Sequence, residues 1–255
     1  MRELTDASTD RYLDLLKNVL VNVIYEDPPL PNPVFTRSEF HRGARERGHD
    51  WPSVAHTMVG RARLDNVQAC LESVLADGVP GDFIETGVWR GGVCILARGI
   101  LRAYGADNRT VWVADSFEGI PATGPDAHPD DIRLAMHQHN AVLAVSQATV
   151  RANFSRYGLL DDQVRFLPGL FSDTLPTAPI ERLAVLRMDG DLYESTMDAL
   201  IHLYPKLSVG GYVIVDDYLV PGCRAAVDEF RSSHALLGDR LEPIDRFSVF
   251  WRRSS

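Results

Sequence analysis

The sequence has no excess of basic residues. Its 255 residues include 26 Lys and Arg against 35 Asp and Glu, which gives a net charge of −9. Domains that bind nucleic acid usually carry a basic patch or stripe, and no run of Lys or Arg supplies one here. Nucleic acid is therefore excluded as an expected partner.

Cysteine is scarce, and long apolar runs are missing. Cys70, Cys94 and Cys223 form no C-x-x-C pair and are expected to be small buried hydrophobes, as in a reducing cytosol. No apolar run reaches the roughly 18 to 20 residues of a membrane span, and the N-terminus "MRELTDASTDRY" lacks the profile of a signal peptide. We expect a cytoplasmic protein with no membrane partner.

Short apolar runs do occur, and they alternate with helical patterns over most of the chain. Strands are expected in "DFIE" (82–85), "RTVWVADS" (109–116), "QVRFLPG" (163–169), "LAVLRM" (183–188) and "GYVIV" (211–215), with a terminal hairpin in "LEPIDRFSVFWRR" (241–253). This alternation predicts an α/β fold with a doubly wound, mostly parallel, seven-stranded sheet and an antiparallel end.

The N-terminal part, 1–56, is expected to be a helix and an arm in front of the main domain, 57–255. Residues 10–26 predict an amphipathic helix, and "DPPLPNP" after it predicts an extended arm; a second helix is expected over 57–76. Since both faces of the sheet already carry helices, we expect the apolar face of 10–26 to dock on another subunit in a homo-oligomer.

One connection is far longer than the usual ~2 to 6 residues. The segment at about 117–154 is punctuated by Pro and Gly in its first half and has a helical pattern in its second half. Segments of this kind often cover a site, so we expect a lid.

A glycine-rich turn joins the first strand to its helix in "FIETGVWRGGVCI". Gly87, Gly91 and Gly92 would let a ligand approach the backbone, but their spacing matches neither a P-loop nor the dinucleotide G-x-G-x-x-G motif. Glu85 would repel phosphate and attract a cation, and Asp115 stands where an acid commonly binds ribose. S-adenosylmethionine satisfies both conditions; the alternative is a plain turn with two solvated acids.

Carboxylates also follow two later strands. Asp189, Asp216 and Asp217 should converge at one sheet edge, where they would repel one another unless protonated or bound to a cation. An all-oxygen ligand set favours Mg²⁺. Asp191 lies two residues further on and is the candidate base for a metal-activated hydroxyl; its alternative role is a helix cap.

The segments "GDFIETGVWRGG", "VWVADSFEGIP", "RFLPGLFSDTLP", "LAVLRMDGDLYESTMDALIHLYPKLSVGGYVIVDDY" and "PGCRAAVDEFR" together resemble the macrocin O-methyltransferase family. Its members are metal-dependent, S-adenosylmethionine-using enzymes that methylate sugar hydroxyls of glycosylated antibiotics, among them macrolides and the noviose of aminocoumarins. The resemblance runs from about Tyr12 to Arg252. It implies a class I methyltransferase (Rossmann-like) fold and an oligomer.

The resemblance also implies roles for individual residues. It matches Asp189, Asp216 and Asp217 to the metal ligands and Asp191 to the base of the aminocoumarin branch. The macrolide branch points to a histidine, so His137, His139 and His56 are alternatives. Cofactor contacts are implied for Thr57, Met58, Glu85, Thr86, Gly87, Asp115, Ser116, Phe171, Ser172, Asp173 and Asp189.

The sequence thus predicts an O-methyltransferase that acts on a deoxysugar hydroxyl of a small-molecule glycoside. Two alternatives stay open: a metal-dependent methyltransferase acting on a phenolic aglycone, and a scaffold that binds S-adenosylmethionine without catalysis. The four clustered acids argue against the scaffold, because such charges cost stability when nothing neutralises them.

Overall fold

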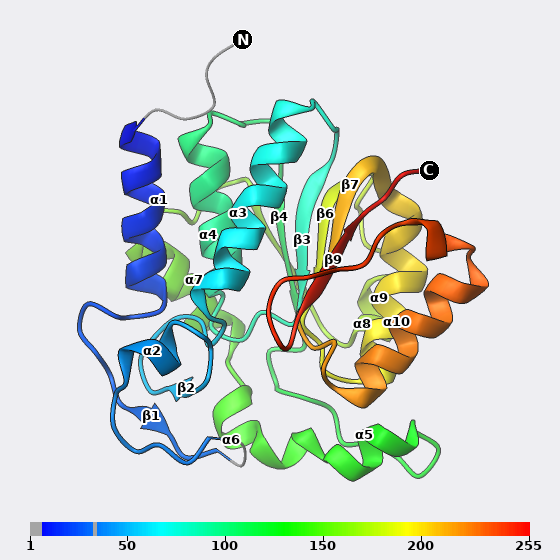
Figure 1. Cartoon of the computed structure of the whole chain (residues 1–255), viewed down its shortest axis with the longest axis horizontal. Helices are drawn as coiled ribbons and strands as arrows, with labels where there is room; N and C mark the ends of the chain where they lie inside the picture. Colours follow the sequence, from blue (N-terminus) through cyan, green and yellow to red (C-terminus); the bar gives the residue numbers. More distant parts are fainter. Residues whose placement is uncertain (1–6, 33–34) are drawn as a thin grey trace.

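The computed structural model describes residues 7–32 and 35–255. Within them, seven strands form the central sheet (Figure 1). Their order across the sheet is β5 (Val164–Pro168), β4 (Val111–Asp115), β3 (Asp82–Thr86), β6 (Leu183–Met188), β7 (Leu207–Val215), β9 (Val249–Arg252) and β8 (Glu242–Pro243). The strands from β5 to β7 are parallel, and β9 runs antiparallel to both β7 and β8. The predicted fold class is confirmed.

Helices cover both faces of this sheet. Figure 1 shows α1 (Ala7–Leu20), α3 (Arg61–Ala76) and α4 (Gly92–Ala103) on one side, and α9 (Tyr193–Leu203) and α10 (Pro221–Ser233) on the other. The strand order changes direction between β3 and β6, because the chain runs outward from β3 through β4 to β5 and then returns to β6. Ligands of such sheets bind beyond the carboxyl ends of the strands at this point.

Helix α1 packs its apolar face against another helix of the same chain. Leu13, Leu16 and Leu20 are buried in one hydrophobic cluster with Leu96 and Ile100 of α4. The predicted reason for subunit docking, an apolar face with no place on the domain, is therefore wrong. The helix is also shorter than the predicted 10–26, because the chain leaves it in a series of turns after Leu20.

The arm after α1 folds back on itself as β1 (Pro29–Leu30), α2 (Arg42–Arg45) and β2 (Trp51–Pro52), with β1 and β2 antiparallel. Arg45 is buried at its centre and pairs with Asp27 at 2.7 Å and Asp50 at 2.8 Å. Pro33 of the predicted arm lies outside the described residues. The second predicted helix begins at Arg61 rather than at Thr57, because 57–60 are not helical and Thr57 lies against Gly92 at the start of α4.

The segment 117–154, called the lid segment below, holds α5 (Pro129–Leu134), the 3-10 turn η1 (Met136–His139), α6 (Asn140–Leu143) and α7 (Gln147–Arg156). Figure 1 shows α5 and α6 beyond the carboxyl ends of the strands. The short helix α8 (Phe171–Thr174) follows β5, and the 3-10 turns η2 (Tyr204–Lys206) and η3 (Leu236–Gly238) complete the elements. The lid segment therefore faces the edge of the sheet where ligands bind.

No helix in the described parts of the chain combines the length and apolarity needed to cross a bilayer. Cys70, Cys94 and Cys223 are free and buried, as predicted.

Candidate active site

A pocket of about 790 Å³ lies at the carboxyl ends of the central strands. Its polar wall comes from the turns after β3, β4, β6 and β7. Its apolar wall comes largely from the arm and the lid segment and includes Phe35, Trp51, Met58, Trp89, Ile120, Leu134, Met136 and Leu143. The pocket can hold an organic molecule of substantial size against charged groups.

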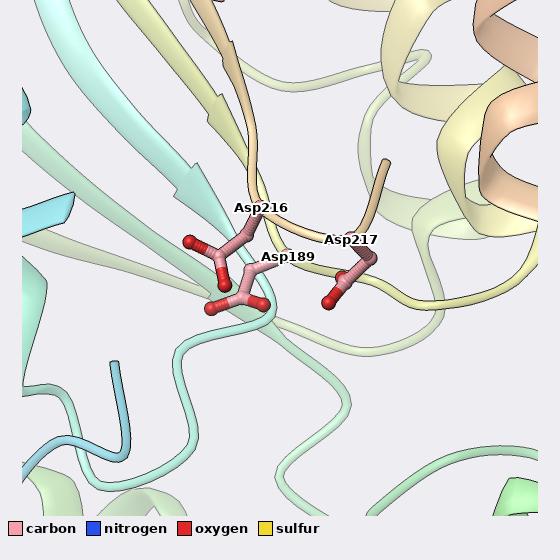
Figure 2. A group of neighbouring side chains, drawn as sticks. All are labelled: Asp189, Asp216 and Asp217. Carbon is pink, nitrogen blue, oxygen red and sulfur yellow. The ribbon is translucent and has the colours of Figure 1, made fainter. Parts of the chain in front are cut away.

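Three carboxylates gather at this edge because the hydrogen-bond ladder continues past the strands. The Asp189 N–H donates to the carbonyl of Thr86 at 2.8 Å, and the Asp216 N–H donates to that of Met188 at 2.9 Å. Figure 2 shows the side chains of Asp189, Asp216 and Asp217 close together beyond β6 and β7. One oxygen from each lies within 4.8 Å of the others. The predicted convergence of the acids is confirmed.

Two guanidiniums that the sequence analysis missed neutralise part of this charge. Arg187 is fully buried and pairs with Glu85, Asp189 and Asp216. Arg63 pairs with the other oxygen of Asp216. The chain itself therefore supplies part of the positive charge that these acids were expected to need. The signal in the sequence that could have identified Arg187 was a charged residue inside the apolar run "LAVLRM".

The positive charge of the guanidiniums does not balance the negative charge of the carboxylates. Six carboxylates face two guanidiniums in this cluster: Glu85, Asp189, Asp191, Asp216, Asp217 and Asp245 against Arg63 and Arg187. Arg187 and Arg63 hold the pKa of Asp216 below its ordinary value despite its burial. Burial and the neighbouring acids raise the pKa of Asp217 well above its ordinary value. Asp217 is thus the acid of this cluster whose charged form is compensated least.

Asp191 stands between the cluster and the lid segment. It lines the pocket, has a left-handed backbone with φ of 59°, and donates its N–H to Asp217 at 3.1 Å. Burial, with Asp189 and Asp216 nearby, raises the pKa of Asp191 to about 7. A carboxylate with this pKa suits general base work near neutral pH.

The alternative role of Asp191 as a helix cap is wrong. The N-cap residue of α9 is Leu192, whose side chain makes no capping bond. The first N–H of the helix, on Tyr193, instead donates to Asp131 of the lid segment at 2.7 Å.

The glycine-rich turn after β3 comes very close to the turn that carries Asp189. Gly87 has φ of 89°, and a Cβ at this position would collide with the Asp189 carbonyl. Asp115 fixes the same turn from β4, since it accepts the N–H of Val88 at 2.7 Å and that of Phe117 at 2.8 Å. Burial raises the pKa of Asp115, and these N–H groups oppose the shift.

The structure brings most of the expected cofactor residues to the pocket, but not all of them. The pocket is lined by Met58, Gly87, Asp115, Ser116, Phe171, Ser172 and Asp189, and not by Thr57, Glu85, Thr86 or Asp173. Glu85 is only 1% exposed and is held by Arg187 and the Cys94 thiol. The expectation that Glu85 presents its charge to a cationic ligand is therefore wrong, because that charge meets Arg187.

The alternative histidine bases lie outside the pocket lining. His56 shares a hydrogen bond of 2.7 Å with the Tyr157 hydroxyl, and burial, with Arg156 and Arg90 nearby, lowers the pKa of His56 to about 4. His139 packs edge-on against Trp51 at 5.6 Å. His137 does not line the pocket either. Asp191 is thus the better placed base.

Trp89 of the glycine-rich turn contacts the lid segment. Its indole N–H donates to the carbonyl of Val142 at 3.0 Å, and the Arg90 guanidinium lies 4.0 Å from the ring centroid.

The sequence matches the family model of macrocin O-methyltransferase (TylF) over residues 9–253. The chain belongs to the macrocin O-methyltransferase family. It is 59% identical over 251 residues to the mycinamicin III 3''-O-methyltransferase of Micromonospora griseorubida, covering 98% of both chains. It is 57% identical over 252 residues to the demethyldecarbamoylnovobiocin O-methyltransferase of Streptomyces niveus, covering 98% of this chain and 96% of the relative.

The fold agrees with this family. The solved structure of the O-methyltransferase NovP superposes with a TM-score of 0.92 at 57% identity, over 97% of this chain and 100% of that one. The family resemblance found in the sequence is confirmed, and the chain is a methyltransferase.

Glu85→Ala is expected to destabilise the protein rather than to weaken cofactor binding specifically. The substitution removes one of the three carboxylates that pair with the buried Arg187 guanidinium, and breaking a buried ion pair costs about 3–5 kcal/mol. Urea unfolding without cofactor should show this loss. If the variant were as stable as wild type but bound the cofactor more weakly, Glu85 would have the direct role in cofactor binding that the sequence suggested.

Proposed function

We propose that this chain transfers a methyl group from S-adenosylmethionine to a deoxysugar hydroxyl of a glycosylated antibiotic of the macrolide or aminocoumarin type. The observation that carries the proposal is the carboxylate cluster of Asp189, Asp216 and Asp217 in a pocket with a large apolar wall. The wall suits an apolar aglycone, and the acids suit a hydroxyl that must lose its proton. The names of the mycinamicin and novobiocin relatives support this choice of substrate.

Asp189, Asp216 and Asp217 are the proposed ligands of Mg²⁺. Their oxygens are close enough to share one ion, and the poorly compensated charge of Asp217 favours a cation there. When bound, the ion would supply the Lewis acidity that lowers the pKa of a hydroxyl, which is otherwise close to that of water, about 15.7.

In the proposed reaction Asp191 takes the proton of the acceptor hydroxyl while its oxygen attacks the methyl carbon. When bound, S-adenosylmethionine would supply the methyl group, and the electron pair of the broken carbon–sulfur bond would leave with S-adenosylhomocysteine. The lid segment keeps water out of the pocket.

We propose the cofactor subsites that the family resemblance implies. Gly87 and its neighbours Glu85 and Thr86 form the turn on the methionine side, and Asp115 and Ser116 bind the ribose. The adenine side is assigned to Phe171, Ser172 and Asp173, and the segment with Thr57 and Met58 covers the cofactor.

Asp115→Ala should raise the dissociation constant of S-adenosylmethionine at least about tenfold. The substitution removes charge-assisted hydrogen bonds to the ribose and the acceptor that orders the glycine-rich turn. Calorimetric titration measures the affinity, and the thermal stabilisation given by saturating cofactor should shrink in parallel. Wild-type affinity in this variant would show that Asp115 does not bind the ribose.

A panel of acceptors tests the substrate class. Glycosylated macrolides and aminocoumarins are incubated with the enzyme, S-adenosylmethionine and Mg²⁺, next to their free aglycones and simple catechols. Methylation only where the deoxysugar is present supports the proposal. Methylation of aglycone phenols would favour the phenolic alternative, and cofactor binding without any product would favour the scaffold.

We further propose a cytoplasmic homo-oligomer in which 1–56 forms an N-terminal helix and arm on the methyltransferase domain, 57–255. The free buried cysteines are consistent with a reducing compartment. Tyr12 and Leu15 of α1 and Tyr25 after it are exposed although Leu13, Leu16 and Leu20 are packed, and Tyr25 is 85% exposed. These side chains offer an apolar surface to a second copy.

A further inference from the structure

Asp131 of α5 is an acidic side chain with no exposed surface, although it lies in the lid segment. Its carboxylate is inserted between the N-termini of α9 and α10. One oxygen accepts the N–H of Tyr193 at 2.7 Å. The other lies against Gly222, where a Cβ would collide with it.

Neither helix supplies a cap of its own. The N-cap residues are Leu192 for α9 and Val220 for α10, and neither makes a side-chain capping bond. The first N–H groups of a helix need acceptors, and its dipole favours a negative charge at this end. Asp131 meets this need for α9 from a segment about sixty residues earlier in the chain, whereas its other oxygen packs against α10 without a hydrogen bond.

The same surface holds the lid segment through a second set of contacts. The N–H of His128 donates to the Glu194 carboxylate at 3.0 Å. The His128 ring stacks on the Tyr193 ring with 4.6 Å between centroids and 9° between planes. The lid segment and the first turn of α9 thus provide hydrogen-bond partners for each other.

The contact of Asp131 with the N-termini of α9 and α10, called the junction below, lies next to the candidate base on one side and next to the pocket wall on the other. Tyr193 follows the candidate base, Asp191, by two residues. Leu134 and Met136, which follow Asp131 in the lid segment, line the pocket. A shift of α5 away from α9 would move the pocket wall and release the turn that carries the base.

We propose that Asp131 is a positioning residue that docks the lid segment on α9 and α10 and thereby holds both the acceptor pocket and the Asp191 turn in their working arrangement. The expected effect of Asp131 on turnover rests on the proposed function, whereas its expected effect on the docking of the lid segment does not.

Asp131→Ala and Asp131→Asn separate this role from general stability. Alanine removes the acceptor for Tyr193, whereas asparagine keeps one and caps helices about as well as aspartate. With alanine, hydrogen exchange of amides in 117–154 should accelerate about 10- to 100-fold, and KM for the acceptor should rise by a similar factor while cofactor affinity stays within about threefold. Asparagine should restore both quantities to within about threefold of wild type.

Asp130→Ala is the matched control. It removes a carboxylate from the same helix, but that carboxylate pairs with Arg133 of α5 and not with α9 or α10. Exchange and KM should stay within about twofold of wild type. Equal effects of both alanine variants would overturn the proposal, because the loss would then reflect the charge or helicity of α5.

Gly222→Ala disturbs the junction from α10 rather than from the lid segment. The added methyl collides with the Asp131 carboxylate, while alanine favours α10 itself. Lid exchange should rise in this variant but should change little when the same substitution is made in Asp131→Ala. Additive effects, or an unchanged exchange rate in Gly222→Ala, would overturn the docking role. The single Gly222→Ala variant tests the docking role even if Asp131→Ala does not fold, or if no glycoside is methylated, because an unchanged exchange rate in it overturns that role.

Discussion

Asp217→Asn should reduce turnover at least about 100-fold and leave the enzyme as stable as wild type, or more stable, when metal is absent. Asp217 contributes charge where the cluster has no cationic partner, so its loss should remove most of the affinity for a divalent ion. Asparagine keeps an oxygen that accepts the Asp191 N–H. It also relieves the repulsion that raises the pKa of Asp217, so the metal-free fold should not suffer.

Asp216→Asn provides the contrast. Both oxygens of Asp216 are paired, one with Arg187 and the other with Arg63, so this substitution should lower both activity and stability. Magnesium titration by calorimetry and thermal unfolding in EDTA measure the two effects separately. Wild-type turnover by Asp217→Asn would remove that residue from the metal site.

Asp191→Asn should lose about 10²- to 10⁴-fold in kcat, the usual range for removal of a general base, with metal and cofactor affinity near normal. Asn tolerates the left-handed backbone that Asp191 adopts, so the turn should survive the substitution. The capping of α9 should survive as well, because Asp131 provides it.

Single-turnover methylation at saturating acceptor measures this loss without interference from product release. A rate within a few-fold of wild type would exclude Asp191 as the base. The search would then move to groups brought in by the substrate, since His56, His137 and His139 lie outside the pocket lining.

The positions of the acids could be predicted because they depend on local rules. The carboxyl ends of adjacent parallel strands must share an edge, so Asp189 and Asp216 could be placed together from the strand pattern alone. The mostly parallel sheet with its antiparallel end followed from the same alternation, and the family resemblance pointed to the same fold. These features repeat along the chain and require no knowledge of distant contacts.

The partners of the acids could not be predicted in the same way. Arg63 reaches Asp216 from 153 residues away, and only the folded chain places α3 beside β7. Asp131 caps α9 across 62 residues, although nothing near Asp131 in the sequence marks it as a cap. Helix α1 was assigned to a subunit interface because its place on α4 depends on tertiary packing.

The most direct test of the central claim is mass spectrometry of the product that the purified enzyme makes from a deoxysugar glycoside and S-adenosylmethionine, first in EDTA and then after Mg²⁺ is restored. We predict a singly methylated glycoside, with the new methyl located on the sugar by fragmentation, that forms after Mg²⁺ is added and not before. A product formed equally well in EDTA, or one methylated on the aglycone, would contradict the account.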